Sequence, residues 1–276
     1  MAFTATDVKN LREMTGVGMM DCKKALTAAD GDFDKAIEWL REKGLAAAQK
    51  KAGRIAADGA GVVVEVNAET DFVAKNDKFV EFVKGVADVV AKANPADMDA
   101  LMAAPYGNGK TVQEQQQEMV LVIGENISVR RFARYADGVS IPYVHAGGKI
   151  GVLVNLELDG IAADAVTELG KDIAMQIAAM NPSFLDKSNV DSSTLDKEKE
   201  ILTAQAKEDP KNAGKPENII EKMVMGRIGK YYEENCLLQQ PFVKENKTSV
   251  EKHVAEVAKS LGGKIVVKAF TRFEKG

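Results

Sequence analysis

The chain has 276 residues, of which 45% are hydrophobic and 28% are charged, and its formal net charge is −4. This composition is typical of a globular protein with an ample core, and the net negative charge argues against a nucleic-acid surface as its main function. We therefore expect no direct nucleic-acid partner. No apolar run approaches the roughly 18 residues that a membrane-spanning helix needs, so no membrane partner is expected either.

The cysteines and histidines are few. Cys22 and Cys236 lie far apart without a Cys-x-x-Cys neighbour, which is most simply interpreted as a reducing compartment. Because His145 and His253 are the only histidines, a histidine-rich zinc site is nearly excluded and no cofactor is expected. Residues 1–6 lack the charged and apolar regions of a signal peptide, so a cytoplasmic location is expected.

Residues 6–43 have the pattern of three short helices. In the third, apolar residues recur at the i, i+3, i+4, i+7 spacing of an amphipathic helix, starting at Phe33. A bundle this small is typical of a docking module, although the same pattern fits a cap on the next domain. Residues 45–57 are expected to form a connecting helix. We therefore assign 1–53 to a three-helix partner-docking module with its linker helix.

An internal repeat begins at Gly61. The apolar strand-like run at 61–67 resembles the run at 151–157, and the strand-like segment at 127–135 resembles 265–273. The first pair of segments is separated by 90 residues and the second by 138, so the second copy carries 48 additional residues.

Each copy also contains a helical stretch that ends in Asn-Pro, at Asn94 and at Asn181. The repeat predicts an α+β fold with a duplicated core, whose N-subdomain covers 54–138 and whose C-subdomain covers 139–276.

The 48 additional residues predict an inserted antiparallel helical hairpin at about 190–235. Two polar helical segments, 195–207 and 216–233, are joined by a turn that contains proline and glycine. Its apolar stripe is thin: Leu195, Ile201, Leu202, Ile219, Ile220, Met223 and Ile228. Because such a hairpin cannot bury itself fully, a homodimer through the hairpin is a further expectation.

The strand at 127–135 carries three arginines, Arg130, Arg131 and Arg134. Strict alternation places Arg131 on one face and the other two on the opposite face. We expect these arginines to form a solvated basic surface rather than a nucleic-acid reader.

Residues 104–111 end in Gly-Lys-Thr like a phosphate-binding loop. The first glycine of that motif is replaced by Ala104, and the preceding segment, 97–103, reads as a helix rather than a strand. We therefore expect a surface loop. Since no nucleophile motif is present either, bond-making catalysis has no support in the sequence.

The first strand-like run is followed by Thr70, Asp71, Phe72 and Val73. The structural interpretation is that Thr70 or Asp71 caps a helix and Phe72 packs into the local core. Against it, the corresponding place in the second copy, 158–161, has no acidic and aromatic pair. A feature of one copy only is not demanded by the shared fold, which favours a function for this turn.

Four segments together resemble one family. Residues 14–26 are similar to the N-terminal signature of the bacterial translation elongation factor Ts family, and 69–74 are similar to its second signature. Residues 150–154 and 240–243 fit it as well, so the resemblance runs over essentially the whole chain. It implies a ubiquitin-associated-like three-helix module, a two-part α+β core and an inserted helical hairpin.

The resemblance also implies a function. Members act as guanine nucleotide exchange factors without bond-making catalysis, and they bind elongation factor Tu in its GDP-bound and nucleotide-free states. By this resemblance, Thr70, Asp71, Phe72 and Val73 would dislodge magnesium from the partner, with Asp71 and Phe72 as the intruding pair. His145 would contact the nucleotide domain of the partner.

In the N-terminal module, the resemblance implies partner contacts at Val17, Gly18, Met19 and Met20. Two other functions stay open at this point. One is a phosphate-handling enzyme that uses 107–111, and the other is an adaptor that binds elongation factor Tu without accelerating exchange.

Overall fold

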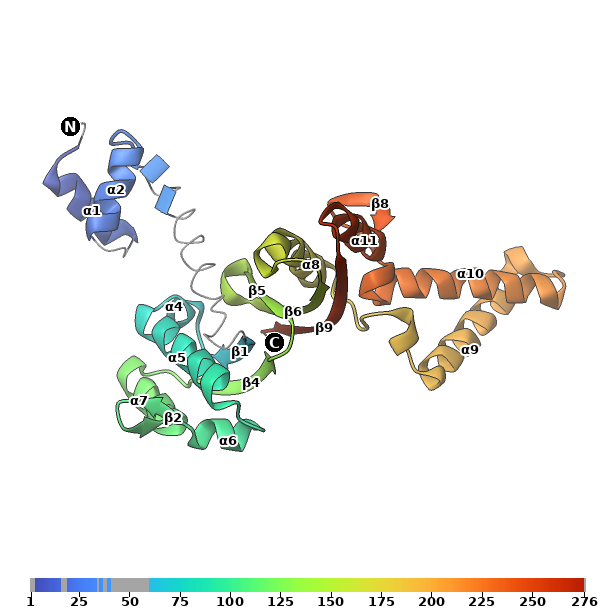
Figure 1. Ribbon diagram of the computed structural model, residues 1–276, viewed down its shortest axis with the longest axis horizontal. Helices are drawn as coiled ribbons and strands as arrows, with labels where there is room; N and C mark the ends of the chain where they lie inside the picture. Colours follow the sequence, from blue (N-terminus) through green and yellow to red (C-terminus); the bar gives the residue numbers. More distant parts are fainter. Residues whose placement is uncertain (1–2, 16–18, 34, 37–38, 41–59, 276) are drawn as a thin grey trace. The chain divides into compact units, whose positions relative to one another are not determined.

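The computed structural model describes residues 3–15, 19–33, 35–36, 39–40 and 60–275. The chain divides into two compact units, Met1–Arg54 and Ile55–Gly276. Figure 1 shows helices in the first unit and both helices and strands in the second, which confirms the expected α+β class. Within these ranges, no helix is long and apolar enough to cross a membrane.

The first unit contains α1 (Ala5–Thr15) and α2 (Met19–Ala28), followed by helical residues at 33, 35–36 and 39–40. The three helical segments share one small core, formed by Val8, Leu11, Cys22, Ala25, Leu26, Ala36 and Leu40. The linker helix expected at 45–57 lies outside the described residues. The ubiquitin-associated-like assignment stays a prediction.

In the first half of the second unit, β1 (Gly61–Asn67) pairs antiparallel with β4 (Ser128–Tyr135). The chain between them forms α4 (Asp71–Ala74), α5 (Asp77–Ala93), α6 (Met98–Ala103), β2 (Pro105–Gly107), β3 (Lys110–Thr111) and α7 (Val112–Ile123). Helix α5 presents Phe82, Val86 and Val90 at the spacing of one helix face, and this face packs on the strands.

In the second half, an antiparallel sheet has the order β5-β6-β9, formed by β5 (Val139–His145), β6 (Ile150–Asp159) and β9 (Lys264–Glu274). A second apolar cluster joins these strands to α8 (Thr167–Met180), α11 (Val250–Ser260) and β7 (Pro241–Phe242), and β7 pairs with β8 (Glu245–Ser249). The connections include the short 3-10 helices η1 (Ala146–Gly148), η2 (Ala163–Val166), η3 (Lys187–Asn189), η4 (Pro210–Asn212) and η5 (Leu237–Gln239).

The two sheets approach each other at two glycines. A Cβ atom on Gly61 would lie 2.1 Å from the Cβ of Ser140, and one on Gly151 would lie 3.0 Å from a methyl group of Val63. Any side chain at Gly61 would push β1 away from β5. Gly61 and Gly151 are separated by the same 90 residues as the two repeat copies.

The helix ends agree with the repeat. Asn94 ends α5 and Asn181 ends α8, each in the left-handed conformation with φ of 46°. The following prolines cannot continue a helix, which explains why the Asn-Pro pairs mark both ends.

The irregularities of the two strand pairs also agree with the internal repeat. β1 and β4 shift register between Glu65 and Val66, which leaves Arg130 without a partner residue on β1. β6 and β9 shift between Asn155 and Leu156, which leaves Lys268 without a partner residue on β6. The two bulges occupy corresponding positions of the repeat, since Glu65 and Asn155 are 90 residues apart and Arg130 and Lys268 are 138 residues apart. These parallels support the duplication, which stays a prediction, as do its subdomain boundaries.

The bulge at Arg130 corrects the expected alternation of Arg130 and Arg131 between opposite faces of the strand. Because the extra residue breaks the alternation, Arg130 and Arg131 both reach the carboxylate of Glu65, with Nη1 of Arg130 at 2.9 Å and Nε of Arg131 at 2.5 Å. Arg134 donates from Nε to the carbonyl of Ala91 at 3.2 Å. Arg130 and Arg131 remain 51% and 41% exposed, so the expected solvated face is present, but its arginines also bond to Glu65.

The inserted hairpin consists of α9 (Ser192–Glu208) and α10 (Glu217–Asn235), joined through η4 (Figure 1). Its buried residues are Ala206, Ile220, Val224 and Ile228, packed with Leu202, Met223 and Tyr232. The predicted stripe was wrong at Ile201 and Ile219, which are exposed. Exposed Ile219 and Met225 flank the buried face of α10 on opposite sides, because each helical residue turns by about 100°. A homodimer through this hairpin stays a prediction.

Candidate functional site

The turn that joins β1 to α4 is organised by Thr70. Its backbone is extended (φ −122°, ψ 154°), and its hydroxyl accepts a hydrogen bond from the backbone N–H of Val73 at 3.4 Å. Thr70 is thus the N-cap of α4, a helix of only four residues. The backbone N–H of Asn76 donates to the carbonyl of Val73 at 2.9 Å, and the Asn76 side chain then caps α5.

The loop between α7 and β4 forms hydrogen bonds with this N-cap residue. The carboxylate of Glu125, between α7 and β4, accepts a bond from the backbone N–H of Thr70 at 3.0 Å and another from its hydroxyl at 2.6 Å. In the opposite direction, the carboxylate of Glu69 accepts from the backbone N–H of Asn126 at 3.3 Å. Carboxylates of both loops therefore bind the backbone of the other loop.

Two neighbouring apolar residues of this turn, Phe72 and Val73, differ strongly in their exposure to solvent. Val73 is 8% exposed and belongs to the apolar cluster under β1 and β4, whereas Phe72 is 88% exposed. The structural interpretation of this stretch was therefore right about the Thr70 cap and wrong about Phe72. An aromatic ring with little burial in its own chain is available for burial against another molecule.

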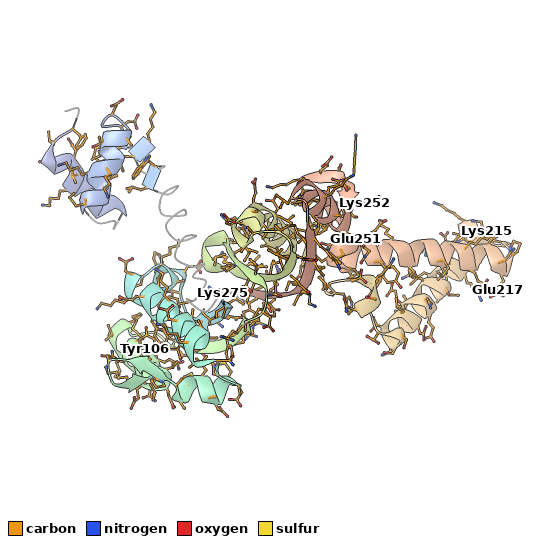
Figure 2. All side chains as sticks on the ribbon, in the orientation of Figure 1. Tyr106, Lys215, Glu217, Glu251, Lys252 and Lys275 are labelled. Atoms are coloured by element: carbon orange, nitrogen blue, oxygen red, sulfur yellow. The ribbon has the colours of Figure 1, made fainter. Side chains whose placement is uncertain are left out.

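Asp71 lies in a positive environment made by distant parts of the chain. Lys275, which Figure 2 labels, donates from Nζ to the Asp71 carboxylate at 3.1 Å, and its backbone N–H donates to the carbonyl of Lys149 at 2.9 Å. The Lys275 bond, followed by the charges of Lys275, Lys149 and Lys75, holds the pKa of Asp71 below its ordinary value of 3.8. Asp71 is therefore ionised at neutral pH.

His145 is the last residue of β5 rather than a loop residue. Its side chain is exposed, and its Nδ1 lies 3.0 Å from the hydroxyl of Tyr143. The turn after it, residues 146–149, ends at Lys149 next to Lys275. The structure thus links the turn that follows His145 to Asp71 through Lys275, which no local sequence pattern indicated.

The predicted contact residues of the N-terminal module are only partly described. Val17 and Gly18 lie outside the described residues, and Met19 begins α2. Met20 follows it on the same helix and is 67% exposed.

The Gly-Lys-Thr segment forms part of a folded hairpin. β2 and β3 pair around Asn108 and Gly109, and Thr111 caps α7 in a capping box with Glu114. Lys110 is ion-paired with Glu118. The expectation of a loop was thus wrong in detail, and the helix expected before it is confirmed as α6. A phosphate-binding loop follows a strand and directs its lysine at the phosphate, whereas residues 104–111 follow α6 and Lys110 pairs with Glu118.

Metal binding receives no support from the part of the chain that the structure describes, where no group of three or more His, Cys, Asp or Glu side chains could hold an ion. Sequence reasoning missed Glu125 and Lys275. Glu125 lies 55 residues from Thr70 and Lys275 lies 204 residues from Asp71, so their roles follow only from the pairing of the strands.

Comparison with known proteins identifies one family. The family model described as Elongation factor TS matches residues 69–276. Elongation factor Ts of Clostridium perfringens (strain SM101 / Type A) is 50% identical, over 99% of this chain and 93% of that protein. Elongation factor Ts of Clostridium botulinum (strain Eklund 17B / Type B) is 48% identical over 99% and 93%, and that of Trichlorobacter lovleyi is 48% identical over 100% and 93%.

Proposed function

The chain belongs to the elongation factor Ts family, and we propose that it is a guanine nucleotide exchange factor that promotes release of GDP from elongation factor Tu. Family membership makes it a translation elongation factor. Its partner in this proposal is elongation factor Tu, in the GDP-bound and nucleotide-free states. The protein then acts by binding and makes or breaks no covalent bond.

The exposed ring of Phe72 carries the proposal. It projects from a turn that is fixed on both sides, by the buried Val73 and by the Thr70 cap. Burying such a ring in a cleft of the partner contributes about 1.5–3 kcal/mol. Because each tenfold change in an equilibrium constant corresponds to about 1.4 kcal/mol, one ring provides about one or two factors of ten.

The target of the ring is the magnesium and phosphate site of the partner. Magnesium bridges nucleotide phosphates to the protein that holds them, so disturbing its ligands weakens the binding of GDP. Coupling is reciprocal: a factor that weakens GDP binding by some ratio is itself bound more weakly, by the same ratio, when GDP is present. Preferential binding to the nucleotide-free state is therefore sufficient for exchange.

The four residues of the turn have different roles in this proposal. Phe72 enters the partner, and the ionised Asp71 next to it disturbs the ligand geometry around magnesium. A single carboxylate is a poor magnesium site, so Asp71 is not proposed to capture the ion. Thr70 and the buried Val73 orient the other two side chains.

Further contacts enlarge the interface. The exposed His145 contacts the nucleotide domain of the partner, at the same end of the sheet as Lys149. In the first unit, residues 17–20, including the exposed Met20, dock on that domain as well. Full-length Met20→Glu should weaken binding to nucleotide-free elongation factor Tu by at least tenfold, as measured by titration calorimetry, and unchanged affinity would exclude this contact.

The central test is stopped-flow release of fluorescently labelled GDP from elongation factor Tu. Phe72→Ala should reduce the accelerated release by about 10- to 100-fold, and Phe72→Leu should retain part of it because an apolar side chain remains. Ile201→Ala on the hairpin removes an exposed apolar side chain elsewhere and serves as the matched control. Wild-type rates with Phe72→Ala would remove Phe72 from the mechanism.

The same experiment separates the two other functions. An adaptor would bind elongation factor Tu and leave GDP release unchanged even as wild type. A phosphate-handling enzyme would bind nucleotide in the absence of elongation factor Tu, and Lys110→Ala would abolish that binding.

A further inference from the structure

The β1–α4 turn is joined to the α7–β4 turn by side chains where strand pairing stops. The last backbone pair of β1 and β4 is Asn67 with Ser128. Counting outward, Glu69 lies opposite Asn126 and Thr70 lies opposite Glu125. These are the residues joined by the crossed carboxylate bonds, with Glu125 accepting both the N–H and the O–H of Thr70.

The second strand pair closes the same place without carboxylates. There the backbone ladder continues to Asp159 opposite Lys264, and the next two residues are Gly160 and Gly263. A Cβ built on Gly160 would lie 3.8 Å from the Cα of Gly263, and one on Gly263 would lie 2.3 Å from the carbonyl oxygen of Asp159. The backbones approach closely here, and the two positions that correspond to Thr70 and Glu125 carry no side chain.

The strand pairing itself thus does not require Glu125. Its carboxylate belongs to the one strand end that is followed by Phe72. Helix α4 has only four residues, too few to be stable by its own hydrogen bonds. The Phe72 side chain, 88% exposed, contributes little to holding its own position. The orientation of Phe72 depends on Val73 beneath it and on the Thr70 cap beside it.

We propose that Glu125 is a positioning residue for nucleotide exchange, which fixes the Thr70 cap and so holds Phe72 in the orientation that enters the partner. This proposal rests on the proposed role of Phe72. A ring held in its bound orientation loses less conformational freedom on binding, so preorganisation increases the rate and affinity of productive contact.

The chemistry of Glu125 is matched to Thr70. An ionised carboxylate has two oxygens that only accept, and the N–H and O–H of Thr70 are two donors. Glutamine at position 125 would keep one accepting oxygen, but its NH2 group would face one of the two Thr70 donors. Alanine would remove both bonds. Thr70→Ser keeps both donors, whereas Thr70→Val keeps the shape and loses the O–H.

The test is a double-mutant cycle with the full chain, read as stopped-flow release of labelled GDP from elongation factor Tu. Glu125→Ala should slow release about 3- to 10-fold, with Glu125→Gln between it and wild type. Thr70→Ser should release GDP faster than Thr70→Val, and Thr70→Val should resemble Glu125→Gln. Glu118→Ala is the matched control, because Glu118 is a carboxylate of α7 that pairs with Lys110.

The decisive variant is Glu125→Ala combined with Phe72→Ala. If Glu125 acts through Phe72, the double variant releases GDP at the rate of Phe72→Ala alone. A further loss in the double variant, or a wild-type rate for Glu125→Ala while Phe72→Ala is impaired, would overturn the role of Glu125. A wild-type rate for Phe72→Ala would instead overturn the proposed role of the turn itself. Hydrogen exchange at the Val73 amide, faster in Glu125→Ala than in Glu118→Ala, would support the positioning role independently of activity.

Discussion

Replacing the buried carboxylate of Glu65 should destabilise the second unit. Glu65 is 7% exposed at the bulge between β1 and β4. Its oxygens accept bonds from Arg130 at 2.9 Å, from Arg131 at 2.5 Å and from the amide of Asn67 at 3.2 Å. Arg131 also donates to the carbonyl of Glu274 at 3.4 Å, and its guanidinium lies 4.4 Å from the ring centre of Phe273 on β9.

The magnitude follows from the two arginine bonds. A hydrogen bond to a charged group contributes about 1.5–3 kcal/mol to the free energy of unfolding. The side chains of Arg130 and Arg131 are 51% and 41% exposed, so in Glu65→Ala both regain water and about half of each bond is recovered. The expected loss is therefore about 1.5–3 kcal/mol in total.

The assay is urea unfolding followed by far-ultraviolet circular dichroism. Fluorescence of the only tryptophan, Trp39, would report the first unit instead. With an m value of about 2–3 kcal/mol/M, the midpoint of Glu65→Ala should fall by about 1 M. Glu157→Ala is the control, because its carboxylate pairs with Lys268 across neighbouring strands at an exposed site. An unchanged midpoint for Glu65→Ala, or an equal shift for Glu157→Ala, would refute the reasoning.

The pH dependence gives a second check on Glu65. Burial raises the pKa of this carboxyl, but the bonds from Arg131 and Arg130 outweigh it and leave the pKa below the ordinary value of 4.5. A lowered native pKa means that the stabilisation is fully present above pH 4.5 and is lost as the pH falls through the native pKa. The difference between wild type and Glu65→Ala should therefore shrink in acid, and a difference that widens there would contradict the assignment.

Three further predictions concern the site and its surroundings. Val73→Ala should lower the free energy of unfolding by about 1–3 kcal/mol and slow GDP release at the same time, because the buried anchor of α4 is lost; urea unfolding and stopped-flow release measure the two effects. Lys275→Ala should raise the pKa of Asp71 toward 3.8, as followed by NMR titration of its carboxyl, since the hydrogen bond and nearest charge are removed. Cys236, whose pKa is raised to about 11 by burial, should resist iodoacetamide at about pH 8 in the native protein and react in urea, as quantified by peptide mapping; rapid native alkylation would contradict its burial.

Long elements could be predicted from sequence because their signals repeat many times. The run from Gly61 identified β1, and the Asn-Pro pairs located the ends of α5 and α8 to within a residue. The hairpin helices were found between their turn residues as α9 and α10. In each case the local structure was determined by a pattern repeated over several residues, or by a residue such as proline whose backbone conformation is restricted.

The site could not be predicted in the same way, because short elements have no periodicity to read. Whether Phe72 or Val73 faces the core depends on the phase of a four-residue helix, which the Thr70 cap and its contact with Glu125 decide. The faces of Arg130 and Arg131 depended on a single bulge, which shifts the alternation by one residue. Both errors came from one-residue effects of tertiary pairing.

Comparison of positions within the predicted repeat helps to separate the requirements of the fold from those of function. Glu65 and Asn155 are 90 residues apart, occupy the two bulges and are both 7% exposed. Asn155 donates to the carbonyl of Asp137 at 2.6 Å and to the hydroxyl of Ser140 at 3.1 Å. A buried polar side chain thus accompanies the bulge in both copies, with different chemistry: Glu65 binds side chains, whereas Asn155 binds a backbone carbonyl and a hydroxyl.

Thr70 and Glu125 differ from this pattern. Their counterparts Gly160 and Gly263 have no side chain that could form equivalent hydrogen bonds, and the backbones approach closely there. A polar pair that one copy contains and the other replaces by glycine is not a requirement of the shared architecture. The pair is joined instead to the turn that exposes Phe72, the most exposed of the large apolar side chains that the structure describes. Phe72 and Glu125 should therefore be tested as one unit.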